Sequence, residues 1–210
     1  MKKIHFFFSV VTTLATFCLT SGHTQTVEIG TQVWMTKNLN VNKFRNGEPI
    51  PQAKTNQEWQ RAGENKEPAW CYYVNDPRYG EIYGKLYNWY AVADPRGLAP
   101  EGWKIPSVDD WMLLMNRVGF GNTSGKALKN TSGWARSGNG SNKYQFSALP
   151  GGGRGPSGDF DNVSYNANFW SSTARASGVS TFILSFDKFD FVTPFPILPS
   201  CGSSIRCIRD

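Results

Sequence analysis

The chain has 210 residues and a formal net charge of +6 at neutral pH, from 22 Lys and Arg against 16 Asp and Glu. Beyond Lys2 and Lys3 the basic residues are scattered singly, which excludes a basic run of the kind that binds nucleic acid or a membrane surface. Aromatic residues make up 14% of the chain and predict a well-packed core, while 21 Gly and 12 Pro indicate many turns and loops.

The first residues are typical of a secretory leader. Met1–Lys3 is a short positive start, and Ile4–Leu19 is an apolar run shorter than the roughly 20 residues that span a bilayer. We expect a signal peptide over residues 1–24, cleaved near the small residues Thr20–Gly22. The mature chain, residues 25–210, is then exported to the periplasm, the cell surface or the medium. Its length of about 185 residues predicts a single domain, and no further apolar stretch is long enough to span a membrane.

Histidine is expected to be almost absent from the mature chain. The two histidines are His5, inside the leader, and His23, beside the expected cleavage point. Ser-His-Asp and Cys-His catalytic sites and the commonest imidazole metal sites therefore have no side chain to use. We expect no catalytic residue, no metal site and no cofactor.

The first half of the mature chain predicts a hairpin and short helices. Val27–Leu39 reads as a hairpin, because apolar residues alternate with polar ones on either side of a turn at Gly30-Thr31. A short helix is indicated over Asn56–Ala62, and another over Lys85–Ala93, which Asp94-Pro95 would stop.

The clearest helix follows Pro106. Ser107 is a candidate N-cap, and Asp110 stands three residues on, where its carboxylate meets free backbone NH groups. Gly119 is a suitable end. Apolar residues at helical spacing would form the buried face: Trp111, Leu114, Met115 and Val118.

After Trp134 the pattern changes to short β-like pieces separated by Gly, Pro, Asn and Asp. Helices near the middle, with strands before and after, predict an α+β fold and not a parallel doubly wound sheet. The expected strands are Phe146–Leu149, Phe169–Ser172, Phe182–Phe186, Phe189–Val192 and Ser204–Ile208.

One glycine pattern superficially resembles a dinucleotide-binding loop. Gly153, Gly155 and Gly158 match G-x-G-x-x-G, but a dinucleotide loop must open a helix, whereas Pro156 and the polar residues up to Asn162 predict turn and loop. We interpret the whole stretch as a turn.

Three pairs of carboxylates are close in sequence. A glycosidase needs two carboxyl groups flanking the scissile bond, but such close pairs are common. We assign Asp109/Asp110 to a helix N-terminus and the other two pairs, Asp159/Asp161 and Asp187/Asp190, to turn chemistry.

Aromatic residues are dense from Trp70 to Tyr90. Exposed rings would form a stacking platform for sugars, and buried rings a core, which is the fate we expect for most of them. Tyr72, Tyr73 and Tyr79 flank the polar run Asn75–Arg78, so these three are the candidate ligand contacts.

Three cysteines remain after Cys18 leaves with the leader. Disulfides form in an exported protein, but three cysteines cannot all pair. Cys201 and Cys207 could close a small loop, or Cys71 could join Cys207 across the fold, and spacing alone does not decide between these pairings.

Several long stretches, in order, closely resemble the Fibrobacter succinogenes major paralogous domain. Together they cover nearly all of the chain from about Val27 to Asp210. The stretches are Gly30–Met35, Asn38-Leu39, Trp70–Tyr73, Tyr83–Val92, Ala99–Ser107, Phe146–Gly152, Phe169–Thr173 and Ile205–Asp210.

The resemblance implies an exported bacterial protein, of a kind common in Bacteroidetes and Fibrobacter relatives. It implies a fold similar to C-type lectins and to the formylglycine-generating sulfatase-modifying domain. Its Cys-Tyr-Tyr and Arg-Cys motifs imply a Cys71–Cys207 disulfide, with Cys201 outside the pattern. Calcium-dependent sugar binding is not implied, because the chain offers only Glu67-Pro68-Ala69 and no Trp-Asn-Asp.

Three hypotheses about function follow. The first is a non-enzymatic binding or adhesion module for a glycan, a peptide or a protein, which the near-absence of histidine and the aromatic loops favour. The second is an oxidase that resembles the formylglycine-generating enzyme and uses Cys201 and Cys207 as a copper-binding thiol pair. The third is a structural component of the envelope.

Overall fold

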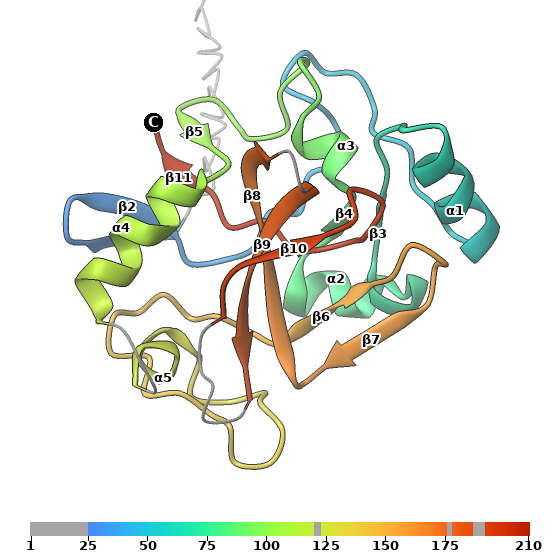
Figure 1. Ribbon diagram of the computed structural model, residues 1–210. Coiled ribbons are helices and arrows are strands. Elements are labelled where there is room, and N and C mark those ends of the chain that lie inside the picture. The colour runs from blue at the N-terminus through green and yellow to red at the C-terminus, as the bar shows by residue number, and fades with distance from the viewer. Residues whose placement is uncertain (1–24, 120–122, 176–177, 187–191) are drawn as a thin grey trace, which may run out of the picture.

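The structure is a computed structural model that describes residues 25–119, 123–175, 178–186 and 192–210. It mixes short helices with small sheets, so the predicted α+β class is confirmed (Figure 1). The expected leader, both histidines and the Asp187/Asp190 pair lie outside the described residues. None of the helices in the described part of the chain is long and apolar enough to cross a membrane.

One sheet joins the two ends of the chain. The predicted hairpin is confirmed, with its turn at Gly30, whose φ of +66° is in the left-handed region that glycine adopts without strain. The last strand pairs with the second strand of the hairpin, so the first and last elements lie side by side (Figure 1). The order is β1 (Thr26–Ile29), β2 (Gln32–Met35), β11 (Ile208–Arg209) and β5 (Trp103–Lys104).

A second, five-stranded sheet lies at the centre of the molecule (Figure 1). Its neighbours are antiparallel except for β6 and β8, which pair in parallel. The strands predicted at Phe169 and Phe182 are confirmed within it. The order is β10 (Val192–Ile197), β9 (Gly178–Ser185), β8 (Asn166–Arg175), β6 (Gly151–Arg154) and β7 (Phe160–Val163).

The helices are short and surround these sheets. The predicted helix near Asn56 is confirmed, while α2 and α5 escaped prediction. They are α1 (Asn56–Glu64), α2 (Pro77–Tyr83), α3 (Trp89–Val92), α4 (Val108–Val118) and α5 (Ser124–Leu128).

The helix predicted after Pro106 is α4, and its local signals work as expected. Ser107 Oγ accepts from the backbone NH of Asp110 at 3.1 Å, and the Asp110 carboxylate accepts from the backbone NH of Ser107 at 2.9 Å. Trp111 stacks on Phe182 of β9 with ring centroids 5.0 Å apart. The capping role given to Asp110 is therefore confirmed, and the buried face of α4 covers the five-stranded sheet.

Part of the helix predicted over Lys85–Ala93 is wrong. Leu86–Tyr87 forms strand β4, which pairs with β3 (Trp70–Cys71), and only Trp89–Val92 is helical. Pairing with a distant strand overrides the helical spacing of the apolar residues, which is a common outcome for short segments.

Two predicted strands are much shorter in the structure than expected. Phe146–Leu149 has only an isolated bridge from Ala148 to Lys129, and of Ser204–Ile208 only Ile208 joins a strand. The expected strand Phe189–Val192 lies outside the described residues except for Val192, where β10 begins.

The glycine-rich stretch contains no dinucleotide loop. Strand β6 covers Gly151–Arg154, a turn follows at residues 155–158, and the chain continues into β7 without a helix. Our interpretation of the whole stretch as a turn is therefore wrong for Gly153 and Arg154, which belong to β6, and for Phe160–Asn162, which belong to β7. The exclusion of a helix after the glycines is confirmed.

The segment Gly202–Cys207 passes through the middle of the fold. Its residues bridge to β6, β4 and β8 in turn, through Gly202, Ser203 and Ser204. The carbonyl of Cys207 then accepts from the backbone NH of Met35, the last residue of β2, and the carbonyl of Ile205 accepts from that of Leu39. Since all six residues are buried, this segment connects the sheets and brings Arg206 close to the N-terminal hairpin.

Candidate functional site

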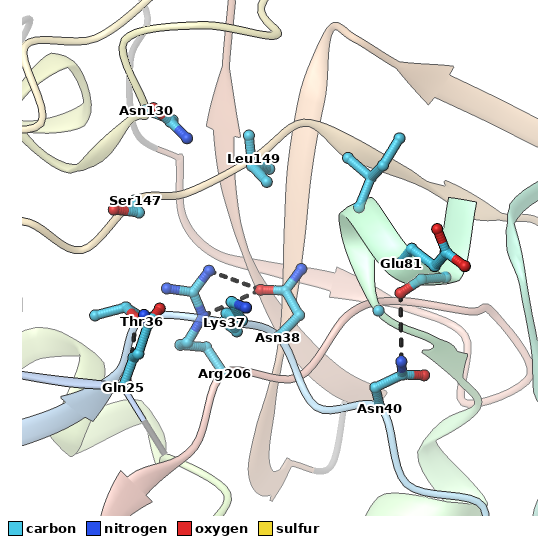
Figure 2. Close-up of a pocket in the computed structure, with 13 residues that line it drawn as sticks. Gln25, Thr36, Lys37, Asn38, Asn40, Glu81, Asn130, Ser147, Leu149 and Arg206 are labelled. Carbon is cyan, nitrogen blue, oxygen red and sulfur yellow. Dashed lines mark hydrogen bonds between the residues drawn. The ribbon is translucent and has the colours of Figure 1, made fainter. Parts of the chain in front are cut away.

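A polar cleft of about 360 Å³ lies between the segment after β2, the helix α2 and the loop before β6 (Figure 2). This volume is within the range of roughly 300–1,000 Å³ that is usual for small-molecule sites. Its polar side chains come from six separate parts of the sequence, and they include Gln25, Lys37, Asn38, Asn40, Glu81, Asn130, Ser147 and Arg206.

Two glycines let α2 approach its neighbours closely enough to form one wall of the cleft. A Cβ on Gly80 would lie 2.2 Å from Cε1 of Tyr72, which is far inside contact distance. A Cβ on Gly84 would lie 2.9 Å from the carbonyl oxygen of Leu39, and Gly84 also has a φ of +74°. Glycine is therefore required at both positions by the packing and, at Gly84, by the backbone.

Two asparagines attach the segment after β2 to this helix. Asn38 Nδ2 donates to the carbonyl of Tyr83 at 2.9 Å, and Asn40 Nδ2 donates to the carbonyl of Gly80 at 3.3 Å. The oxygen of each amide accepts from a cation: Asn38 Oδ1 from Arg206, and Asn40 Oδ1 from Lys85 at 2.8 Å. Both amides thus link α2 to a buried positive charge.

Arg206 is buried beneath the cleft, with 1% of its surface exposed. Its Nε and Nη2 donate to Asn38 Oδ1 at 3.0 and 2.7 Å, and its Nη1 donates to the carbonyls of Met35 and Phe146. The guanidinium also lies over the rings of Phe146 and Phe169, 4.6 and 5.5 Å from their centroids. Burial lowers the pKa of Arg206 to about 9.

Lys85 forms a second buried cation behind the cleft. Its Nζ donates to the backbone carbonyl of Asn40 at 2.9 Å and lies 4.4 Å from the ring centroid of Trp70 and 5.2 Å from that of Tyr72. Burial lowers the pKa of Lys85. Carbonyl dipoles and aromatic faces hold this charge, as they hold Arg206.

The loop that carries Ser147 is strained where it meets the cleft. Asn142, Gln145 and Ser147 have φ values of +48°, +55° and +57°, in the left-handed region that non-glycine residues rarely adopt. Ser147 is held there because its backbone NH donates to Asn142 Oδ1 at 2.8 Å. Strain of this kind is found preferentially at binding and catalytic sites.

The three tyrosines singled out in the sequence do not form an exposed platform. Tyr73 is buried, with 8% of its surface exposed, and packs against Tyr79 and Phe160 with ring centroids 5.3 and 5.2 Å away. Tyr72 and Tyr79 are half-buried; Tyr72 packs against Gly80, and Tyr79 stacks on Tyr83. The expectation that most rings from Trp70 to Tyr90 are buried holds only in part: none is exposed, but only Trp70, Tyr73 and Tyr87 are fully buried. The selection of Tyr73 as a surface contact is wrong, because Phe160 of β7 packs against it.

The Cys71–Cys207 disulfide implied by the family resemblance is not formed in the structure, where Cys71, Cys201 and Cys207 are free thiols. Successive side chains of a strand point to opposite faces. Trp70 shares the core cluster of Cys207, and Cys71 packs in another cluster on the other side of β3. Burial raises the pKa of Cys71 to about 11 and that of Cys207 to about 12, and it also raises the pKa of Cys201.

Metal ligands do not gather in the described part of the chain. Over those residues no group of three or more His, Cys, Asp or Glu side chains lies close enough to hold an ion. Asp159 accepts from Ser157 Oγ at 2.8 Å, which fits the turn chemistry expected of it.

Comparison with known proteins identifies the family of this chain. A family model described as the Fibrobacter succinogenes major domain matches residues 27–209. The chain belongs to this family. No curated protein and no solved structure matches it.

Sequence reasoning missed the cleft. Asn38 and Arg206 both lie inside stretches that carry the resemblance to the Fibrobacter succinogenes major domain, which was the available signal. They are 168 positions apart, however, and no local pattern indicates that they meet.

Proposed function

We propose that this member of the Fibrobacter succinogenes major domain family is an exported, non-enzymatic binding module of a bacterial envelope, and that the polar cleft above Arg206 is its ligand site. The observation that carries the proposal is the cleft itself, in which amide, hydroxyl and charged groups converge above a buried guanidinium. A site with these groups suits a polar ligand such as a glycan or a peptide.

The leader-like start of the sequence supports export to the periplasm, the cell surface or the medium. Within the α+β class, we propose that the fold is similar to that of C-type lectins. The short helices, small and mainly antiparallel sheets and long loops support that assignment.

The oxidase hypothesis has weaker support. Cys201 packs against the core cluster that contains Cys207, so the two residues share one region. A thiol must lose its proton to bind copper or to attack a substrate, and burial raises the pKa of both side chains. We therefore prefer a binding function.

The test is retention of the purified mature protein on arrays of plant, host and bacterial glycans and on immobilised polysaccharides. Ile82 lines the cleft and is 57% exposed, so Ile82→Ala removes an apolar contact without opening the core. We expect it to weaken retention by about fivefold or more, the effect of one or two buried methylene groups.

Leu113→Ala is the matched control, because Leu113 is 47% exposed on α4, outside the cleft. Equal retention of both variants and the unchanged protein would contradict the cleft as the site. If no glycan is retained and the protein instead co-purifies with envelope proteins in fixed ratio, the structural-component hypothesis replaces this one.

A further inference from the structure

The hydrogen bonds of Arg206 leave one donor for a ligand. A guanidinium carries five N–H groups. The Nε hydrogen and one Nη2 hydrogen reach Asn38, and the two Nη1 hydrogens reach the carbonyls of Met35 and Phe146. The second Nη2 hydrogen has no acceptor among the described residues, although the residue lines the cleft. Figure 2 shows the guanidinium beneath the space between Ser147, Asn130 and Leu149.

The positive charge of Arg206 also lacks an anionic partner. Its protein acceptors are two carbonyls and an amide oxygen, all neutral. The ion pairs of the described residues lie elsewhere and join Asp76 to Arg78, Arg96 to Glu48 and Asp94, and Lys104 to Asp110. A buried cation that meets only dipoles is poorly solvated, and an incoming anion would form a charge-assisted hydrogen bond with it.

The rest of the cleft limits what can carry that anion. Lys37, exposed and next to Asn38 in the chain, adds a second positive charge at the Arg206 end. Glu81 lines the part of the cleft formed by α2, and its negative charge disfavours a second negative group at that end (Figure 2). A ligand with one negative group at one end and neutral hydroxyls at the other fits this arrangement.

The neutral lining favours a sugar over a peptide. Asn40 and Asn130 offer amides and Ser147 a hydroxyl, which are groups suited to ring hydroxyls, and Glu81 is an acceptor for them. Ile82 and Leu149 supply a small apolar wall that suits the C–H face of a pyranose ring. None of the described residues that line the cleft is aromatic, so they offer no ring to hold a large peptide side chain.

Building on the proposed function, we propose that the cleft binds a uronic acid residue of an acidic polysaccharide. Its carboxylate accepts from the open Nη2 hydrogen of Arg206 and is attracted by Lys37. Its hydroxyls contact the amides of Asn40 and Asn130 and the carboxylate of Glu81.

The experiment compares acidic oligomers with forms of the same oligomers that differ only at the carboxylate. Titration calorimetry of the mature protein uses a panel of uronic acid oligomers, including oligogalacturonate, and the same oligomers after reduction of each carboxylate to a primary alcohol. We expect at least one uronate to bind about tenfold or more tightly than its reduced form, the effect of a charge-assisted hydrogen bond. The preference should decrease with added salt, because Lys37 is exposed.

Variants separate the cleft from general charge effects. Lys37→Ala should weaken uronate binding severalfold and leave the reduced oligomer unaffected, whereas Lys54→Ala, an exposed lysine outside the cleft, should change neither. Arg206→Gln should abolish the preference for the uronate. If its melting curve shows that this variant does not fold, the comparison of Lys37→Ala with Lys54→Ala tests the inference.

Three results would overturn the inference. Equal affinity for the uronates and their reduced forms would show that the cleft does not select an anion. Cleft-dependent binding of neutral glycans only, with no uronate bound, would reject the uronic acid and leave the proposed function intact. Binding of acidic peptides without uronates would assign the cleft to a peptide instead. Failure of the proposed function is a different result, in which Ile82→Ala affects no ligand.

Discussion

Replacing Gly80 with alanine tests how α2 forms its wall of the cleft. If Gly80 were an ordinary helical glycine, Ala would stabilise the protein by roughly 0.5–1 kcal/mol, since Gly weakens a helix interior. In the structure, however, the added Cβ would lie 2.2 Å from Cε1 and 2.4 Å from Cδ1 of Tyr72, whereas ordinary contact begins at 3.4 Å. The helix or the ring must therefore move by about 1.2 Å, the difference between 3.4 and 2.2 Å.

The Tyr72 ring cannot move freely, because it packs edge-on against Trp70 with ring centroids 5.1 Å apart, and Lys85 Nζ lies over it. Overpacking of this kind costs roughly 1–3 kcal/mol. Deducting the gain in helix propensity of roughly 0.5–1 kcal/mol, we expect Gly80→Ala to destabilise the protein by about 0.5–2 kcal/mol. That corresponds to a melting temperature lower by about 1–8 °C for a chain of this size.

The assay is thermal and denaturant unfolding of both the unchanged protein and the variant. Gly155→Ala is the control, because a Cβ there meets only ordinary contacts at 3.7 and 3.8 Å and its backbone is not left-handed. It should be neutral or slightly stabilising, through the unfolded state. The sign of the change in melting temperature distinguishes close packing from an ordinary helical glycine. A Gly80→Ala protein with a melting temperature equal to or higher than that of the unchanged protein would refute the close packing of α2 on Tyr72.

Three further predictions concern the helix cap and the thiols. Ser107→Ala should destabilise the protein by about 1 kcal/mol in chemical denaturation, because it removes the capping box of α4. A thiol reagent at pH 8 should label Cys201, which is partly exposed, and should label Cys71 and Cys207 only after unfolding. If the unfolded, unreduced protein has a single reactive thiol, the other two cysteines form a disulfide, contrary to the structure. Burial raises the pKa of Cys71 from 9.0 to about 11, so between these values the unfolded state loses a proton that the folded state keeps, and stability falls as the pH rises. Between pH 9 and pH 11, the free energy of unfolding of Cys71→Ala should fall by up to about 3 kcal/mol less than that of the unchanged protein, as measured from unfolding curves at the two pH values. An equal fall in both proteins would contradict the burial of the thiol.

Local features were predictable from the sequence because the interactions that produce them span only a few residues. The turn of the first hairpin needs a residue that tolerates a positive φ, and Gly30 supplies it. The start of α4 is set by Ser107 and Asp110, which cap each other across three positions. The absence of a helix after Gly158 was also a local matter, since Pro156 and the polar residues after it do not favour one.

Only the tertiary structure decided the features that depend on segments far apart in the chain. Leu86–Tyr87 has helical spacing, but pairing with Trp70–Cys71 makes it a strand. The same alternation that sends Trp70 to one face of β3 sends Cys71 to the other, so sequence motifs alone misplaced the disulfide. The candidate site requires Asn38 to meet Arg206 across 168 positions, which happens because the last segment of the chain is buried between the sheets. The sequence therefore shows which side chains are polar and which are apolar, while long-range packing determines which of them line the same cleft.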